Sequence, residues 1–506
     1  MTRNCGISRT LLAVALNASL LVLVFDPFPG QLGKNPGSVP QAALAGSAET
    51  GFGRVPGRLP GEQCGAAAAH VLRLRLPAGS LLVMQSLDIT GSSHTFRLRA
   101  GAGDGAGDSA AEFSETAAVR CISVGQARLS GFAVRGPVAG GSRLPDGPVV
   151  FPAGDASAAV WPARRLLLPV FTAAGVRELA AECRCVYRGA VVTVYADPKL
   201  IPAEPPQSAR LCSLLERHLQ RGSGTLRTAV ESLLGAIDDV DGDGRLTVVL
   251  TRLDYRVQPD SPGSDIVPVL GCVREADFLD PHSEFGGDIL YLAPEGLLDA
   301  GGESLLAHEL SHAAVHSRQR ERLQAGRPKL EIPGWFHESL AHFAEHSAAG
   351  PGQHFERRLE AFHLHPQASP IVQHFAAGWD AGRGGSRAAG LMFLQSALQP
   401  SANAPELLRT CSTFTELLEG MLQQPFTESL ADWGPVAAEQ ILRSKPLAIP
   451  NLLPGGAHTG RLRGTALQCW RNDGGQLTIE VQAARAAEIR LSVLLCEDGA
   501  SGLTAD

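Results

Sequence analysis

Two histidines and a glutamate at helical spacing are the clearest candidates for chemistry in this sequence. They lie in His308-Glu309-Leu310-Ser311-His312, among apolar and small residues. Residues four apart share one face of a helix, so His308 and His312 can direct their imidazoles at one metal ion. Glu309 flanks the pair and can reach a water molecule beside that ion. The pattern predicts a zinc site in which Glu309 is the general base of a hydrolysis.

A third zinc ligand is expected from a later segment, because catalytic zinc sites use three protein ligands and keep one position open. The metzincin class of peptidases would place Gly at position 315 and His at position 318. Val315 and Arg318 stand there instead, which excludes that class. The next candidate helix carries the pattern W-x-x-E-x-L-A, with Trp335 and Glu338 at its first two fixed positions.

This second helix resembles the glutamate-ligand helix of gluzincin metallopeptidases, whose usual form is W-L-N-E-G-L-A. The resemblance implies that Glu338 is the third zinc ligand, after His308 and His312. It also matches Glu345 to a glutamate that is frequent near the end of the same helix, for which we assign no role.

The resemblance to secreted hyicolysin-type gluzincins covers residues 165–440 in order. It implies an α+β catalytic domain with a small β-sheet, an active-site helix and a helical C-terminal half. The segments that carry it, besides the two motifs, are Val194–Asp197, Asp239–Gly244 with the following strand 246–250, and the strand 288–292.

In such an enzyme the metal lowers the pKa of water and polarises the scissile carbonyl, and Glu309 passes a proton from the water to the leaving amine. The developing oxyanion needs a further hydrogen-bond donor. Related enzymes often supply a tyrosine or a histidine, but no tyrosine follows Tyr291 in this chain. The candidates for oxyanion or substrate contacts, which we do not rank, are His342, His374 and Arg387.

An acidic motif precedes one of the predicted strands. Asp239, Asp241 and Asp243 match ligand positions 1, 3 and 5 of an EF-hand loop, and Gly244 stands at its turn position. Position 12 is Leu250, so the bidentate glutamate of that loop is absent. Two interpretations stay open, a sharp acidic turn into a strand and a Ca²⁺ site completed by residues from elsewhere.

The composition limits the class of protein. The chain has 506 residues, too many for one ordinary domain, and its hydrophobic fraction of 44% is normal for packed cores. A net charge of −7 argues against a basic nucleic-acid-binding surface. The expected partner is therefore a protein or peptide substrate and not a nucleic acid.

The N-terminus predicts export from the cytoplasm. Arg3 and Arg9 precede an apolar run at residues 11–25, which is short for a transmembrane helix. The best small-x-small triplet, at positions 43–45, lies unusually far downstream for a cleavage site. Residues 1–45 are thus a signal peptide or an uncleaved anchor, which would be the only contact with a membrane. We expect the rest of the protein to be secreted or extracytoplasmic.

Alternating apolar and polar residues predict β-rich segments on both sides of the metallopeptidase-like region. We assign residues 50–165 to a β-sandwich-like domain, 166–445 to the zinc metallopeptidase domain and 446–506 to a small C-terminal β module.

Two functional hypotheses follow. The first is an exported zinc-dependent endopeptidase. The alternative is a catalytically weak or inactive, peptidase-like surface protein whose β modules bind or adhere to a partner. The missing tyrosine and the two β segments motivate the alternative, and peptide cleavage separates the two hypotheses.

Overall fold

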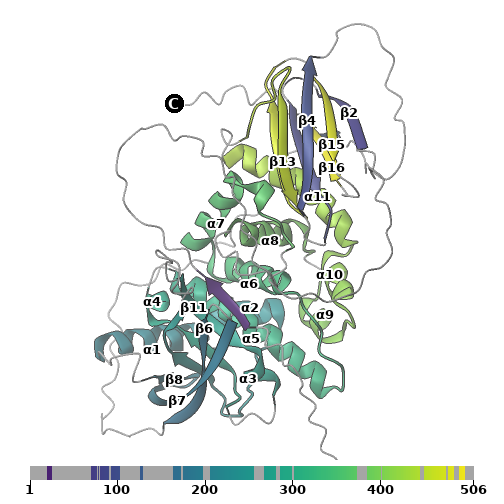
Figure 1. Ribbon diagram of the computed structural model, residues 1–506. Coiled ribbons are helices and arrows are strands. Elements are labelled where there is room, and N and C mark those ends of the chain that lie inside the picture. The colour runs from purple at the N-terminus through teal and green to yellow at the C-terminus, as the bar shows by residue number, and fades with distance from the viewer. Residues whose placement is uncertain are drawn as a thin grey trace, which may run out of the picture.

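The protein has an α+β fold, as the sequence predicts: a mixed sheet with helices, and a β-sandwich beyond them (Figure 1). The structure is a computed structural model. It describes residues 20–24, 70–76, 78, 80–89, 93–102, 126–128, 163–172, 175–197, 205–255, 267–280, 285–298, 301–372, 384–399, 402–444, 449–474, 477–483 and 489–495.

Eight strands of the described residues form one mixed sheet, in the lower part of Figure 1. Their order is β1-β11-β12-β9-β8-β7-β6, and β10 pairs with β11. The neighbours β8, β9 and β12 run parallel, whereas β11 runs antiparallel to β12. The bounds are β1 (Leu20–Val24), β6 (Arg164–Thr172), β7 (Gly175–Arg188), β8 (Val192–Ala196), β9 (Leu246–Leu250), β10 (Leu253–Tyr255), β11 (Val267–Arg274) and β12 (Ile289–Leu292).

Both faces of this sheet are covered, so its inner strands are continuous apolar runs. In β9, Val248 packs into the core shared with the helices, while Val249 packs on the opposite side with Leu166 of β6. Successive strand residues point to opposite faces, which explains this division. The hairpin of β6 and β7 therefore covers the face of the sheet that the helices leave open.

The helices include a central pair, α5 and α6, which pack against each other. A Cβ at Gly302, the first residue of α5, would lie 2.3 Å from the carbonyl oxygen of Leu297, so α5 can begin against α4 only with glycine. None of the described helices is long and apolar enough to cross a membrane. The bounds are α1 (Pro205–Leu219), α2 (Leu226–Leu234), α3 (Glu275–Leu279), α4 (Pro294–Leu298), α5 (Gly302–Gln324), α6 (Gly334–Ala349), α7 (Gln353–Leu364), η1 (Pro366–Ala368), α8 (Gly384–Ala397), α9 (Ala404–Thr410), α10 (Phe414–Leu422) and α11 (Phe426–Ser444).

Strands from the two ends of the chain form a β-sandwich, in the upper part of Figure 1. One sheet has the order β13-β4-β15-β2 and the other β14-β3-β16-β5. Trp470 and Phe96 meet edge to face in the core between them, with ring centroids 5.6 Å apart. The bounds are β2 (His70–Leu76), β3 (Ser80–Ser86), β4 (Ser93–Ala102), β5 (Gln126–Arg128), β13 (Ala457–Arg463), β14 (Leu467–Asn472), β15 (Leu477–Ala483) and β16 (Ile489–Leu495).

This pairing corrects the predicted division into two separate β modules, at residues 50–165 and 446–506. The C-terminal strand β15 lies between β2 and β4, and the N-terminal strand β3 lies between β14 and β16. Each segment therefore supplies alternate strands of a shared sandwich. Alternation of side chains along one strand does not reveal its partner, so local patterns could not show this arrangement.

The predicted boundary between residues 165 and 166 falls inside β6, whose first residues already pair with β7 in the central sheet. Of the predicted signal peptide or anchor, the structure describes residues 20–24, which pair as β1 with the edge of β11. The export signal stays a prediction.

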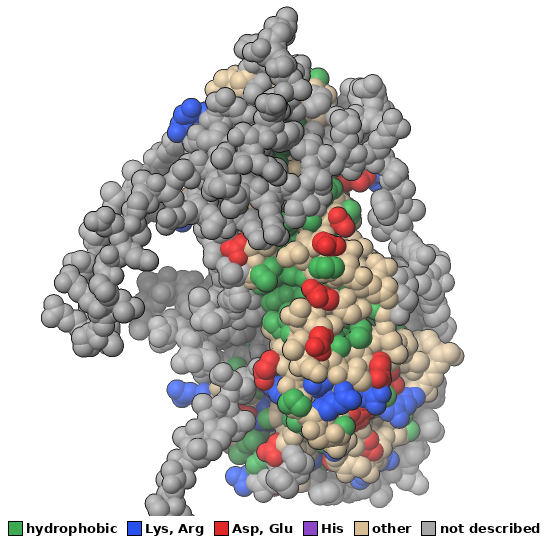
Figure 2. All heavy atoms as spheres, turned by 90° about the vertical axis from the view of Figure 1, so that its right-hand side faces the viewer, with side chains coloured by type: hydrophobic (Ala, Val, Ile, Leu, Met, Phe, Trp, Pro, Cys, Tyr) green, Lys and Arg blue, Asp and Glu red, His purple; other side chains and the backbone are tan. Residues whose placement is uncertain are grey.

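Charged side chains are mixed on the face shown in Figure 2. A band of Lys and Arg crosses its lower part, and Asp and Glu lie beside and above that band. Both signs of charge therefore lie close together on the described part of this face.

A chain that ends at residue 445 tests the shared sandwich. Without β13 to β16, the strands β2 and β4 lose the strand between them, and Phe96 loses its contact with Trp470. We expect tryptic cleavage at Arg97 and Arg99 of β4 to accelerate roughly tenfold or more, because an unpaired strand opens readily. Mass mapping of a limited digest measures this. If β4 resists trypsin in the shortened chain as well as in the full chain, the N-terminal segment folds independently.

Candidate metal centre

Helices α5 and α6 bring the residues of the two motifs together. His308 and His312 of α5 and Glu338 of α6 each offer a ligand atom, and these atoms all lie within 4.8 Å of one another. The three residues are buried, with at most 4% of each exposed. The sequence predicted these three as zinc ligands, and the structure places them close enough to share one ion. The presence of zinc itself remains a prediction.

Glu345, to which the sequence assigned no role, holds His308 in place. Its Oε2 lies 3.2 Å from Nδ1 of His308, while Nε2 of His308 lies 3.7 Å from Oε2 of Glu338. Since a carboxylate accepts the Nδ1 proton, Nε2 keeps a lone pair for a metal ion. Glu345 follows Glu338 by two helical turns, a spacing that places both on one face of α6. The spacing of Glu338 and Glu345 in the sequence could therefore have indicated that Glu345 faces the same site.

Both ring nitrogens of His342, a candidate for an oxyanion contact, form hydrogen bonds with other side chains. Its Nε2 accepts a hydrogen bond from Nη1 of Arg358 at 2.7 Å, and its Nδ1 donates to Oε2 of Glu345 at 2.8 Å. Because arginine only donates, these contacts define the tautomer of His342. Arg358 comes from α7, and nothing in the sequence pointed to it.

The other two candidates for oxyanion or substrate contacts are Arg387 and His374. Nη1 of Arg387, on α8, forms an ion pair with Oε2 of Glu338 at 3.0 Å, so this guanidinium points at a predicted metal ligand. His374 lies outside the described residues. The structure therefore brings His342 and Arg387 to the centre, each bound to a buried side chain.

Five buried histidines of α5 and α6 form a row of neighbouring rings, with centroids 4.5 to 5.1 Å apart from ring to ring. Burial is the main cause that lowers the pKa of every member, to about 3 for His337 and well below the usual range for the others. All are neutral near pH 7, the form in which imidazole binds metals. The histidine row consists of His342, His308, His312, His337 and His316.

Glu309 is enclosed between the sheet and α6. Burial raises its pKa well above the usual range, and the neighbouring carboxylates of Glu338 and Glu345 raise it further. The strand β11 passes so close that a Cβ at Gly271 would lie 2.5 Å from Oε1 of Glu309. The side chain of Glu309 is thus positioned by a glycine on the neighbouring strand.

The donor set fits a cation. Among the described residues, Nε2 of His308 and both carboxylate oxygens of Glu309 are buried without a hydrogen-bond partner. Buried polar atoms are rarely left in this state, because desolvation without a partner is costly. A divalent ion would contact neutral imidazole and carboxylate ligands together, which is a set typical of zinc.

The carboxylates that lie together in the structure are not the same three that the acidic motif predicts. Asp239 and Asp241 offer carboxylate oxygens within 4.8 Å of each other and of Asp288, whereas Asp243 is not part of this group. Oδ1 of Asp243 instead accepts a hydrogen bond from the backbone N–H of Arg245 at 2.8 Å. Two of the three aspartates that the sequence singled out thus lie together with Asp288, and the binding of Ca²⁺ stays a prediction.

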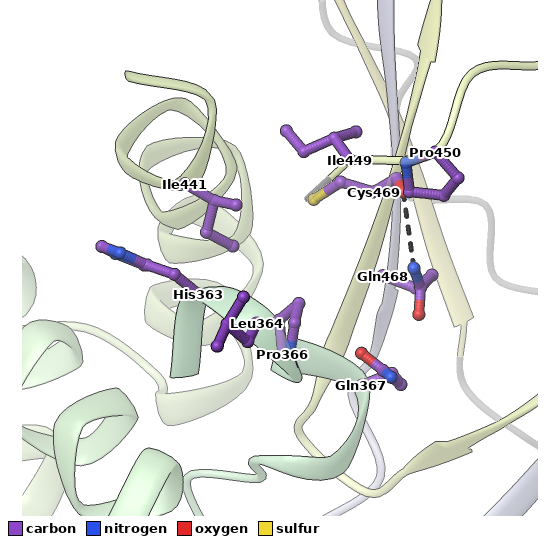
Figure 3. A pocket seen from close by; sticks show the side chains of 9 residues that line it. All are labelled: His363, Leu364, Pro366, Gln367, Ile441, Ile449, Pro450, Gln468 and Cys469. Atoms are coloured by element: carbon purple, nitrogen blue, oxygen red, sulfur yellow. Dashed lines mark hydrogen bonds between the residues drawn. The ribbon is translucent and has the colours of Figure 1, made fainter. Parts of the chain in front are cut away.

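A separate pocket of about 280 Å³ lies between the helical half and the sandwich (Figure 3). His363 and Leu364 of α7 line one side, and Gln468 and Cys469 of β14 line the other. Its lining contains no residue of the histidine row.

No family model matches the chain, and no curated protein is significantly similar to it.

Replacing Gly271 by alanine should displace Glu309. The added methyl group overlaps the carboxylate, and a displacement of about 1 Å of a catalytic group lowers turnover roughly 100-fold. Zinc content should not change, because the three atoms nearest to the added methyl group all belong to Glu309 and not to one of the three predicted ligands. Hydrolysis of casein and zinc per chain measure the two effects. Gly222→Ala, where a Cβ meets nothing within 4 Å, is the control, and equal activity in both variants would contradict the prediction.

Glu345→Gln should weaken zinc binding about 10- to 100-fold, because the amide no longer accepts the His308 proton as strongly. Competition with a chelating dye measures the affinity. Glu356→Gln, at an exposed position of α7, should bind zinc like the unmodified protein. An unchanged affinity in Glu345→Gln would mean that Glu345 does not orient a ligand.

Proposed function

We propose that this protein is a zinc-dependent endopeptidase of gluzincin type. The observation that carries the proposal is the buried group of His308, His312 and Glu338, with Glu309 directly beside it in the sequence and in space. The order of sheet, α5 and α6 agrees with the arrangement that the resemblance to hyicolysin-type peptidases implies. We further propose that the enzyme acts outside the cytoplasm, on the basis of its N-terminal sequence.

The three ligands would hold zinc through two neutral imidazoles and one carboxylate. Bound zinc lowers the pKa of water and polarises a carbonyl group. On the protein side, Nε2 of His308 is kept unprotonated because Glu345 accepts the proton on Nδ1. Neutral His312 stacks on His337, with ring centroids 4.8 Å apart, and this contact limits rotation of its ring.

Glu309 is the residue that moves a proton. Its pKa is raised by burial and by two neighbouring carboxylates, so its oxygens are more basic than those of an exposed glutamate. A nearby cation would act in the opposite direction and favour the ionised carboxylate, which is the form that a general base needs. Glu309 can then accept a proton from water and deliver it to the leaving amine of a peptide.

A specific contact also favours the alternative of a peptidase-like binding protein. Arg387 places a positive charge 3.0 Å from Oε2 of Glu338, where it competes with a metal ion for the same carboxylate. If this ion pair persists in solution, the protein binds zinc weakly and does not cleave peptides. The composite β-sandwich would then be its functional part.

Zinc content and casein cleavage, measured on one preparation, test the proposal. We expect about one zinc per chain, and cleavage that a chelator abolishes and added zinc restores. Glu309→Gln should keep zinc and lower turnover by at least about 1000-fold, because general base catalysis is lost while the ligands remain. Glu303→Gln, a partly exposed position on the same helix, is the matched control and should stay active.

Either of two results would refute the peptidase. The first is cleavage that persists in Glu309→Gln or in the presence of a chelator. The second is stoichiometric zinc without cleavage of casein or of a peptide library, which supports the binding protein instead.

A further inference from the structure

A second group of carboxylates lies at the amino ends of two parallel strands. The loop between α2 and β9 carries Asp239 and Asp241, and Asp288 directly precedes β12. Since β9 and β12 pair in parallel, their first residues lie side by side, and the backbone N–H of Thr247 donates to the carbonyl of Asp288 at 3.1 Å. This pairing brings residues almost fifty positions apart into one group.

Asp288 is the unusual member of this group. Only 1% of it is exposed, and its Oδ1 is buried without a hydrogen-bond partner among the described residues. Its ligand oxygen lies within 4.8 Å of those offered by Asp239 and Asp241. Burial and these two carboxylates raise the pKa of Asp288 to about 8. A buried carboxyl group with one unpartnered oxygen, which faces two other carboxylates, is typical of a site that a cation completes.

The loop itself is shaped around the group. Gly242 and Gly244 have φ of 74° and 76°, a region that favours glycine and lets the loop turn sharply. The backbone N–H of Gly244 donates to Oδ2 of Asp239 at 2.9 Å, which orients that carboxylate. Nη1 of Arg164 lies 3.0 Å from Oδ2 of Asp241, and the positive charge of Arg227 acts on Asp288. Because Arg227 also pairs with Glu231, these two guanidinium groups do not balance the three carboxylates.

We propose that Asp239, Asp241 and Asp288 bind a Ca²⁺ ion that ties the loop before β9 to the start of β12. All three ligands are carboxylate oxygens, without the imidazole or thiolate that zinc prefers. Ca²⁺ accepts six to eight oxygens in irregular geometry, and two of the carboxylates are exposed enough for water to complete the shell. The site is separate from the metal centre at His308 and does not depend on peptidase activity.

Calorimetric titration of CaCl₂ into the chelator-treated full-length chain tests the site. A Glu309→Gln background prevents self-digestion during the measurement. We expect one Ca²⁺ per chain and a Tm that rises by about 5 °C in millimolar Ca²⁺, because only the folded state binds the ion. MgCl₂ should raise Tm less, since Mg²⁺ demands regular octahedral geometry.

Two asparagine variants distinguish the structural site from a general effect of negative charge. Asp288→Asn should abolish the heat of binding and the rise in Tm, whereas Asp243→Asn, outside the group, should retain both. Without Ca²⁺, Asp288→Asn should melt no lower than the parent, because it removes a buried acid without changing its shape. His312→Ala should bind Ca²⁺ normally, which separates this site from the zinc centre.

The proposal is overturned if the parent shows no Ca²⁺-dependent heat and no change in Tm. It is equally overturned if Asp288→Asn binds Ca²⁺ as the parent does, or if Asp243→Asn loses binding to the same extent. An equal rise in Tm with Mg²⁺ would overturn the choice of Ca²⁺.

Discussion

The contact between α5 and α6 buries several ionisable side chains. Such groups destabilise a fold unless opposite charges or hydrogen bonds replace their lost hydration. Carboxylates from Glu309, Glu338 and Glu345 lie together, and isolating one such charge from water costs several kcal/mol. Two arginines and the neutral histidine row supply the compensation that the described residues contain. Nε2 of His308 and Oε2 of Glu338 are among the buried atoms that still have no hydrogen-bond partner in the described part of the chain, and a cation would contact both. The other residues of the site therefore have to balance the charges that are buried between α5 and α6.

The surrounding architecture keeps that interface closed. Strand β11 presses Gly271 against Glu309, and α7 and α8 bring Arg358 and Arg387 against α6. The sandwich is joined to the helical half where Nε2 of Gln85 donates to the carbonyl of Leu430 at 2.7 Å. Its strands come from residues 70–128 and 457–495, so its formation holds these two distant segments together at one end of the molecule (Figure 1). The metal centre is therefore enclosed by β11 and by the helices α5 to α8.

The two candidate ion sites differ in the chemistry of their ligands. The centre at His308 combines imidazoles with a carboxylate and is completely enclosed, whereas the group at Asp288 has oxygen ligands alone and is half open. Softer nitrogen ligands favour zinc, and hard oxygen ligands favour Ca²⁺. The two sites are linked along the chain, because Asp288 directly precedes β12 and β12 leads through α4 into α5. A loop fixed at the start of β12 would steady the segment that leads to the metal ligands.

The sequence by itself determined the α+β class and singled out His308, His312 and Glu338, because helical spacing places the two histidines on one face and Glu338 follows in a motif of its own. The structure brings these three side chains together. Tertiary structure decided the rest. Which strands pair across the sandwich depends on contacts between distant segments, and no local period encodes them. The same reason explains why Asp288, rather than Asp243, completes the acidic group. Parallel pairing of β9 and β12 creates that proximity, and it exists only in the folded chain.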